Sequence, residues 1–456
     1  MKINNKNKAL FAVALALVSA GFTSCKDEPD KYEVAGGVPT IDYVRPVDAA
    51  SKDSLLTAAS LNNTICIVGR NLRSVTEIDF NDQKAVLNTS YMTDNTIIVT
   101  VPKAIPNKVS DKIYFIAGKD TIDYDFKTIV PAPEINSMSN EWAAAGEEVT
   151  ISGDYFLDYD NSHLAIKVGD DYTLPYEDLK ISQNSIKFNM PENMPKHEPI
   201  YITTVNGTST APFQYMDNRG MLFDFDTPWK EGGDVLSNNG WHGRTIQADD
   251  TSLSGNYLVM GDADMDVDGA WNDGNFSFEY WPGSWQDPET YSSRPRMQDV
   301  ADFRDWQNLS LKFEMRISKD NGWSAAPMQI YFGSATQVSN GAAGVQDIYG
   351  RVLAGANNTF FHEKGKLARA LYMPWQNTED KLYNTDDKWV TVTIPLSDFV
   401  YDYDGNKGLS YSGVNDFDAF NIFIVKGAYD DATVLPTGVK CHPIIKIDNI
   451  RVVPNK

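Results

Sequence analysis

Apolar and polar residues alternate along much of the chain after residue 38. The pattern is clearest in residues 309–317, where every second residue is apolar, and it recurs in residues 389–394. Because successive side chains of a strand point to opposite faces, this alternation predicts half-buried antiparallel strands. The periodicity of an amphipathic helix is nearly absent, so we expect an all-β fold.

Residues 39–217 contain one pattern of short strands twice. Segments of the first copy correspond in order to segments of the second: 39–46 to 133–139, 65–72 to 149–156, and 97–102 to 186–191. Turns rich in Gly, Pro and Asn separate the strands, which predicts two small β-sandwiches at residues 39–130 and 131–217. In the motifs that begin at Gly69 and Gly153, the glycine is expected to permit a turn that returns Leu72 and Phe156 to the core.

The composition changes after residue 217. Trp142 is the only tryptophan before this point, and the strands that follow are longer and more widely spaced. The predicted strands are 221–225, 257–260, 276–281, 309–317, 328–332, 368–373, 389–394, 420–425 and 444–453. Long polar connections join them, which predicts one jelly-roll sandwich with elaborated loops over residues 218–456.

The segment from Trp271 to Tyr291 combines tryptophan and tyrosine with Asp, Asn, Gly and Pro. Large apolar residues in such polar company are expected to face a ligand, although packing beneath long loops is the alternative. A flat ring beside amide, carboxylate and guanidinium groups suits a sugar, whose C–H face stacks while its hydroxyls form hydrogen bonds. The predicted ring contacts are Trp271, Tyr280, Trp281, Trp285, Tyr291, Trp323, Tyr372 and Trp375, and the predicted hydroxyl contacts are Asn272, Asp273, Arg294, Arg296 and Gln298. Trp306 and Trp389 lie beside strands and are expected in the core.

The net charge of −22 bears on the kind of partner. A strongly acidic chain repels nucleic acid and anionic polysaccharide, so a neutral polysaccharide is favoured. The same charge also keeps a surface protein in solution, and the two explanations are compatible.

The first 24 residues have the composition of a signal peptide, and residues 25–38 that of a tether. Lys2, Lys6 and Lys8 precede an apolar run that is too short to span a bilayer. The run ends in a segment that resembles a bacterial lipobox, which implies lipidation of Cys25. Residues 26–30 resemble the signal that exports lipoproteins to the outer face of the outer membrane; ordinary secretion and a periplasm-facing anchor are the alternatives. Cys66 and Cys441 are expected to be separate thiols.

Asp264, Asp266 and Asp268 have the spacing of a calcium loop. The twelfth position of that loop is Asn275 rather than the glutamate that an EF-hand requires, so a solvated acidic loop is the favoured interpretation. We predict no cofactor. The histidines lack metal-ligand spacing, and the chain contains no phosphate-binding loop or Gly-x-Ser-x-Gly motif.

A pair of carboxylates would be needed for glycoside hydrolysis. Glu279, Glu289 and Glu314 are available, but Glu279 and Glu314 lie in alternating strands, where solvent exposure is the simpler expectation. We therefore predict a non-catalytic protein.

Both N-terminal copies open with a Pro-x-Ile strand and contain a strand that ends in Gly-x-x-Leu or Gly-x-x-Phe. In these features they resemble the IPT/TIG type of immunoglobulin-like domain. The resemblance implies a stiff spacer without chemistry of its own.

Residues 222–226 and 447–453 look like the paired terminal strands of galactose-binding-like carbohydrate-binding modules, and residues 389–399 are typical of them. The whole plan resembles the surface glycan-binding lipoproteins that occupy the SusE position in Gram-negative polysaccharide-utilisation systems. The resemblance implies an outer-membrane, cell-surface lipoprotein that captures a neutral plant polysaccharide, such as xyloglucan or mixed-linkage β-glucan. It also implies hand-over to a SusC/SusD-like transporter complex. A surface endo-glycosidase, and an adhesin that uses its TIG domains, are the alternatives.

Overall fold

The computed structural model describes residues 33–34, 36–51, 53–226, 244–267, 273–280, 295–334, 367–403, 405–425 and 437–455. The predicted all-β fold is confirmed: in these residues the α-helices are the short α2 (Asp273–Phe276) and α4 (Met297–Val300). Single 3-10 turns are η1 (Ala49–Ser51), η2 (Leu72–Ser74), η3 (Thr89–Tyr91), η4 (Tyr176–Asp178), η6 (Trp306–Asn308), η7 (Lys319–Asn321), η8 (Pro374–Asn377), η9 (Leu396–Asp398) and η10 (Val414–Asp416). None of the helices in the described ranges has the length and apolarity that crossing a membrane requires.

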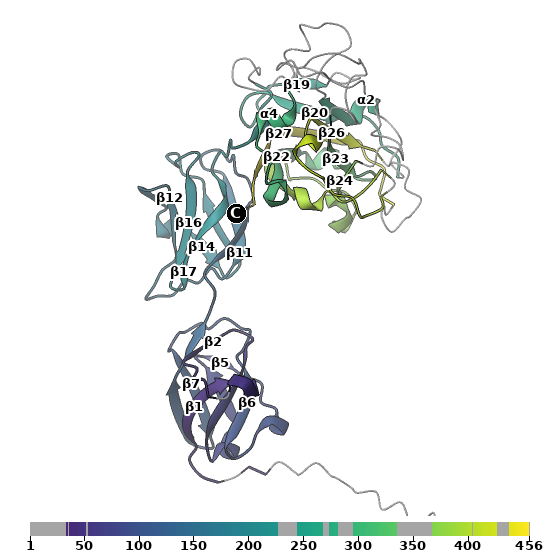
Figure 1. The fold of residues 1–456 in the computed structure, drawn as a ribbon. Helices are drawn as coiled ribbons and strands as arrows, with labels where there is room; N and C mark the ends of the chain where they lie inside the picture. Colours follow the sequence, from purple (N-terminus) through teal and green to yellow (C-terminus); the bar gives the residue numbers. More distant parts are fainter. Residues whose placement is uncertain are drawn as a thin grey trace, which may run out of the picture. The chain divides into compact units, whose positions relative to one another are not determined.

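The chain divides into two compact units, residues 1–130 and 131–456. In the first unit, one sheet has the order β1 (Thr40–Pro46), β3 (Thr64–Arg70), β6 (Thr96–Thr100). A second sheet has the order β5 (Gln83–Lys84), β4 (Glu77–Phe80), β7 (Lys112–Ala117), β8 (Asp120–Asp125), and β2 (Ala58–Ser60) pairs in parallel with β9 (Lys127–Ile129). Ile67, Phe80 and Phe115 are among the fully buried residues of its core. Figure 1 shows the strands of this unit in purple to blue.

The second unit begins with another sandwich. Its sheets have the orders β10 (Glu134–Met138), β11 (Glu148–Asp154), β15 (Ser185–Asn189), β14 (Lys180–Ser182) and β13 (Tyr172–Thr173), β12 (Ala165–Val168), β16 (Pro199–Thr204), β17 (Gly207–Gln214). Ile151, Ile166 and Phe213 lie between them, fully buried. Strands β1 and β10 carry a register shift at corresponding places, between Ile41 and Tyr43 in β1, which is consistent with the repeat in the sequence.

The repeated glycines act differently from the prediction. A Cβ atom on Gly69 would lie 2.0 Å from the carbonyl oxygen of Thr40, and one on Gly153 would lie equally close to the facing strand. Glycine is therefore required because the two backbones approach closely. The left-handed conformation is adopted by Asn71, at a φ of 55°, and Leu72 then returns to the core with no exposed surface, as predicted.

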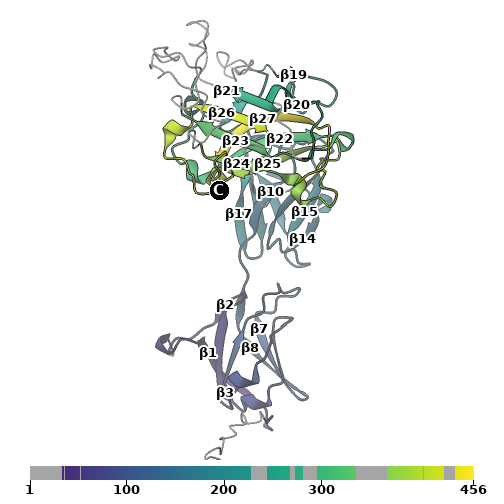
Figure 2. The ribbon, with the colours of Figure 1, turned by 90° about the vertical axis from the view of Figure 1, so that its right-hand side faces the viewer.

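The third sandwich has two unequal sheets. The larger has the order β19 (Thr245–Gln247), β20 (Tyr257–Gly261), β27 (Ile444–Pro454), β22 (Leu309–Ile317), β25 (Trp389–Pro395), with β18 (Met221–Phe223) also paired to β27. The smaller has the order β21 (Ser277–Tyr280), β26 (Ala419–Ile424), β23 (Met328–Gly333), β24 (Arg369–Tyr372), and Figure 2 shows the two sheets stacked. Every strand predicted in this region is present, and the terminal strands pair as expected; within the described residues of this region, the one strand that was not predicted is the three-residue β19.

The expectation that β22 is half-buried is wrong. Its inward residues, such as Phe313, pack in the core between the sheets, but its outward residues Ser310, Lys312 and Glu314 are also at most 4% exposed. The second sandwich contacts this outer face, since Glu141 accepts a hydrogen bond from Lys312. The polar residues of this alternating segment therefore lie in an interface between two sandwiches rather than on a solvated surface.

The two cysteines in the described residues, Cys66 and Cys441, are free, and Cys66 is buried in its strand. Cys441 is half-buried, and its Sγ lies 3.6 Å from the carbonyl oxygen of Ser324. Burial raises the pKa of both thiols, so neither is a reactive thiolate at neutral pH.

Candidate functional site

The smaller sheet of the third sandwich carries a second layer of side chains on its outer face. Phe278, Ile330 and Ile422 point inward to the core between the sheets. Six of the residues that alternate with them are polar or aromatic and are at most 6% exposed: Glu279, Gln329, Tyr331, Arg369, Asn421 and Phe423. Tyr331 and Phe423 belong to an apolar cluster separate from the main core. We call these six residues the outer-face layer.

Arg369 organises the outer-face layer. Its guanidinium carbon lies 4.8 Å from the ring centroid of Tyr331 and 5.4 Å from that of Tyr403, and its Nη1 donates to Oε1 of Gln329 at 2.8 Å. The rings of Tyr331 and Phe423 are stacked, with centroids 6.1 Å apart. Burial raises the pKa of Tyr331 well above its usual value, so the phenol stays neutral. The layer combines ring faces, amides and a planar cation, and all six of its side chains are buried.

The pairing register shows which strand ends lie at the same end of this sheet. Tyr280 pairs with Phe420 and Gly333 with Ala419, so β21 and β23 end where β26 begins. Residues 281–294, which follow β21, and residues 335–366, which join β23 to β24, therefore attach at one end of the sheet. Residues 271–272 precede α2 and attach at the opposite end of β21.

Several of the predicted glycan contacts belong to these loops and lie outside the described residues: Trp271, Asn272, Trp281, Trp285, Tyr291 and Arg294. Asp273 begins α2, but its side chain is likewise outside the described part. Their contact with a glycan stays a prediction.

The prediction is wrong for Tyr280, Trp323 and Trp375, which have no exposed surface and pack in the core. The Tyr280 hydroxyl donates to the carbonyl oxygen of Pro295 at 2.6 Å. Both indole N–H groups donate to the carbonyl oxygen of Ala326, at 3.1 Å from Trp323 and 3.2 Å from Trp375. Because their polar atoms find buried partners, these rings are satisfied inside the sandwich and are not available for stacking.

Tyr372 is half-buried and packs against the Trp323 ring at 6.1 Å. It also lines a cavity of about 400 Å³ between the edges of β24 and β25, together with Tyr401 and Lys407. Lys407 places its ammonium 5.3 Å from the Tyr401 ring centroid. Residues 401–405 combine tyrosine with Asp and Gly in the same way as the segment around Trp281, but no ring contact was predicted there.

Arg296 and Gln298 are both tied to Asp418, at the start of β26. Gln298 donates to its Oδ1 at 2.5 Å, and the Arg296 guanidinium lies 3.6 Å from its Oδ2. These contacts hold α4 beside the end of the sheet where residues 281–294 attach. Both side chains therefore contact the smaller sheet through Asp418, and their contact with sugar hydroxyls stays a prediction.

Trp389 is buried, as expected, but on the outer face of the larger sheet. Its ring meets Tyr257 edge-to-face, and its Nε1 donates to the carbonyl oxygen of Thr251 at 2.8 Å. Trp306 packs against the main core, with its ring perpendicular to that of Tyr411, in agreement with the prediction.

The acidic segment around Asp264 runs beside residues 440–442 through an isolated bridge between Met265 and Cys441. Asp264 lies 2.8 Å from Nδ1 of His442, and Asp266 lies 3.4 Å from Nζ of Lys440. The carboxylates raise the pKa of His442. Asp268 lies outside the described ranges, within which no group of three His, Cys, Asp or Glu side chains is arranged to hold a metal ion.

Comparison with known proteins identifies the class. Residues 215–454 match the family model for the surface glycan-binding protein B xyloglucan binding domain, and residues 133–215 match the IPT/TIG domain. The chain is similar to the crystal structure of the surface glycan-binding protein PbSGBP-B from Prevotella bryantii, with 61% identity and a TM-score of 0.83 over 92% of this chain and 100% of that one. This chain therefore belongs to the surface glycan-binding protein B family.

A curated relative from Bacteroides ovatus, described as an IPT/TIG domain-containing protein, is 25% identical over 224 residues. That match covers 46% of this chain and 44% of the relative, so the chain spans less than half of the relative's length.

Proposed function

We propose that this protein binds a neutral plant polysaccharide, xyloglucan or mixed-linkage β-glucan, at the cell surface without cleaving it. The match of residues 215–454 to a xyloglucan-binding domain carries the proposal. The proposed contact residues include Trp281, Trp285, Tyr291 and Arg294, which follow β21 in the sequence. An extended β-linked chain suits these residues because separate rings can stack on successive sugars.

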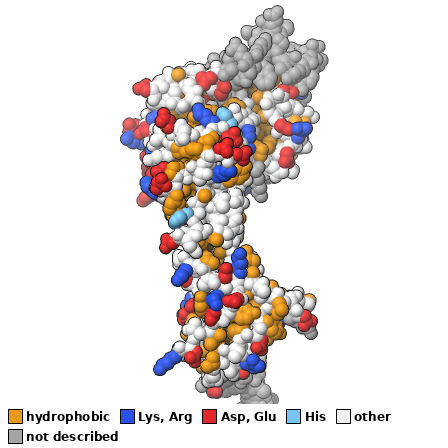
Figure 3. All heavy atoms as spheres, turned by 90° about the vertical axis from the view of Figure 1, so that its left-hand side faces the viewer, with side chains coloured by type: hydrophobic (Ala, Val, Ile, Leu, Met, Phe, Trp, Pro, Cys, Tyr) orange, Lys and Arg blue, Asp and Glu red, His pale blue; other side chains and the backbone are white. Residues whose placement is uncertain are grey.

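The charge distribution agrees with a neutral ligand. Acidic residues outnumber basic ones by 62 to 40, and Figure 3 shows both signs interspersed over one face of the molecule. A glycan without charge avoids the repulsion that a polyuronate would meet.

Two of the three glutamates considered for hydrolysis lie in the described residues and are buried there, whereas Glu289 lies outside those residues. Glu314 was expected at the surface but is fully buried, and its Oε2 accepts a 2.7 Å hydrogen bond from Arg451. Glu279 is also buried, at 6% exposed. An acid and base for glycoside hydrolysis must both reach the scissile bond, which two buried carboxylates cannot do.

We further propose the domain division 25–38, 39–130, 131–217 and 218–456 after a signal peptide of residues 1–24. Three separate cores within residues 44–126, 135–215 and 222–452 support the three sandwiches. Lipidation at Cys25 would anchor the chain to the outer membrane, where a SusC/SusD-like transporter complex would take up the captured glycan.

The expected affinity is modest. If each ring stack contributes ~1–3 kcal/mol, by analogy with base stacking, three rings and a few hydrogen bonds leave a Kd on the order of micromolar to millimolar after association costs. Many copies on one cell that meet one long polymer would then gain avidity.

Affinity gel electrophoresis against xyloglucan, mixed-linkage β-glucan, β-mannan and polygalacturonate tests the proposal. Retardation by a neutral glucan, and its loss in a Trp281→Ala/Trp285→Ala variant, are expected. The exposed Tyr91→Ala substitution in the first sandwich is the matched control and should leave retardation unchanged. No retardation by any neutral glycan would contradict the proposal, and new reducing ends after incubation would favour an endo-glycosidase.

A further inference from the structure

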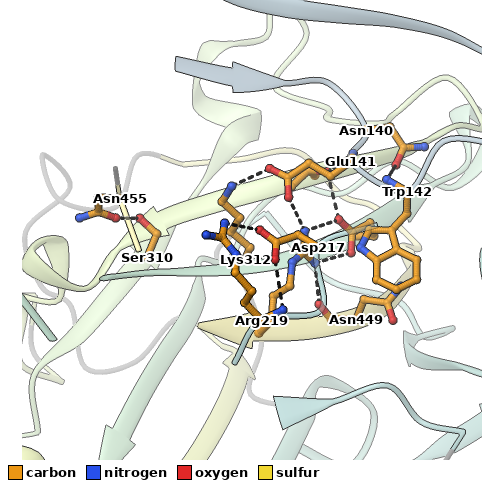
Figure 4. Close-up of polar contacts among 12 residues, drawn as sticks. Asn140, Glu141, Trp142, Asp217, Arg219, Ser310, Lys312, Asn449 and Asn455 are labelled. Carbon is orange, nitrogen blue, oxygen red and sulfur yellow. Dashed lines mark hydrogen bonds and ion pairs between the residues drawn. The ribbon is translucent and has the colours of Figure 1, made fainter. Parts of the chain in front are cut away.

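Six charged side chains meet where the second sandwich contacts the third. Glu141 comes from the loop after β10, Asp217 and Arg219 from the connection between β17 and β18, Lys312 and Glu314 from β22, and Arg451 from β27. Three are acidic and three are basic, so their formal charges cancel. We call them the interface network, and Figure 4 shows several of its members.

Glu141 is the centre of the interface network. Its Oε1 accepts from Nζ of Lys312 at 2.6 Å, and its Oε2 accepts from Nη2 of Arg451 at 2.7 Å. Arg451 in turn donates to both carboxylate oxygens of Glu314, at 2.7 and 2.9 Å. The guanidinium thus bridges a carboxylate of the second sandwich and one of the third, through charge-assisted hydrogen bonds.

Burial distinguishes these pairs from surface ion pairs. The side chains of Glu141, Lys312, Glu314 and Arg451 are between 0 and 5% exposed. A buried charge that loses its partner keeps its desolvation penalty, so removing one member is far more costly than removing an exposed partner. The interface network therefore requires the two sandwiches to remain in contact in one geometry.

Backbone groups reinforce this geometry at β25, an edge strand of the larger sheet. The Thr391 N–H donates to the carbonyl oxygen of Ser139 at 2.9 Å, and the Glu141 N–H donates to Oγ1 of Thr391 at 2.8 Å. The same hydroxyl donates to Oε1 of Glu314 at 3.0 Å. The second sandwich thereby satisfies an edge that would otherwise expose unpaired backbone groups.

We propose that the second and third sandwiches form one rigid, cooperatively folding body, with Glu141 of the TIG domain as the obligatory counter-ion of Lys312 and Arg451. The interface network lies on the outer face of the larger sheet, whereas the outer-face layer lies on the smaller sheet, across the core. The TIG domain thus holds the third sandwich at a fixed orientation, through contacts with the larger sheet. This inference does not depend on the identity of the glycan.

Native-state hydrogen exchange of the full chain in increasing urea, read by peptide, tests the proposal. Strands β11 and β15 of the second sandwich and β22 and β27 of the third are expected to lose protection together at one urea concentration. Loss of protection in one sandwich while the other stays protected would overturn the proposal.

Substitution of Glu141 gives a second test. Glu141→Gln should lower the melting temperature of this body by on the order of 10 °C and speed exchange of the Thr391 amide. Glu148→Gln is the matched control, because Glu148 forms an exposed ion pair with Lys180 in the same sandwich; its melting temperature should change by about 2 °C or less. Equal effects of the two substitutions would refute the role of Glu141. If Glu141→Gln does not fold, Glu141→Asp is measured in its place. Because aspartate keeps the negative charge, the melting temperature of this variant should fall by less than the value expected for Glu141→Gln.

Discussion

Asp448 offers a test of how burial in the third sandwich sets the pH dependence of stability. It lies in β27 opposite Glu314 of β22 and has no exposed surface. Its carboxylate accepts hydrogen bonds from the Asn449 N–H at 2.8 Å and from the Ser254 hydroxyl at 3.1 Å. Burial, with the neighbouring acidic groups of Glu314 and Asp226, raises the pKa of Asp448 to about 8.

The sign of the effect follows from comparing folded and unfolded chains. An unfolded Asp has a pKa of about 4, so the folded state binds the proton more tightly. The stabilisation that the protonated Asp448 side chain gives the folded state is fully present below about pH 4 and is lost as the pH rises to about 8. At about 1.4 kcal/mol per pH unit, this difference sets an upper limit of about 6 kcal/mol. Structural relaxation around the ionised group reduces the realised value, and we expect about 1–3 kcal/mol.

The Asp448→Asn substitution replaces the carboxyl with a neutral group of the same shape. The variant should be more stable than the parent by about 1–3 kcal/mol at pH 8 and should gain nothing at pH 4. Urea denaturation followed by tryptophan fluorescence, in the presence of EDTA to remove divalent cations, measures both values. Asp250→Asn, an exposed neighbour in the loop before β20, is the control and should show no gain at either pH. A variant that is less stable than the parent at pH 8 would refute the reasoning.

Three further outcomes are expected. Trp375→Ala should destabilise the third sandwich by about 3–5 kcal/mol in urea denaturation, because it empties a core site; an unchanged midpoint with lost glycan binding would instead make Trp375 a ligand contact. Gly153→Ala should destabilise its sandwich by more than about 2 kcal/mol, because the new Cβ would lie 2.0 Å from the Glu134 carbonyl oxygen; thermal melting checks this, and a neutral effect would contradict the close approach. Asp264→Asn should lower the pKa of His442 toward its usual value, since Asp264 is the main cause of the upward shift; an NMR titration that shows no change would exclude the contact.

The aromatic residues around Trp281 were predicted to bind a glycan from the composition of their segment, and this reasoning was right for the domain but wrong for some individual rings. Aromatic residues among Asp, Asn and Gly pointed to the third sandwich, which the family match supports as the glycan-binding domain. The same reasoning misassigned Trp323 and Trp375, because the carbonyl oxygen of Ala326 satisfies both indoles inside the core. A local composition cannot show whether a polar partner 49 residues away will reach a given ring.

The backbone pattern was more informative than the side-chain chemistry. The alternation in residues 309–317 and the apolar runs elsewhere were enough to predict the strands, because a period of two depends only on neighbours in the chain. The three-residue β19 was not predicted because a segment of this length is too short to show an alternation of apolar and polar residues.

The sequence by itself determined the all-β architecture, the repeat of the first two sandwiches and the pairing of the terminal strands. Only the tertiary structure decided what each face of β22 contacts. Lys312 and Glu314 alternate with apolar residues as solvent-facing side chains do, yet both are buried against the second sandwich. A polar face is stable either in water or against complementary charges, and only the approach of Glu141, 171 residues away from Lys312, decides between them.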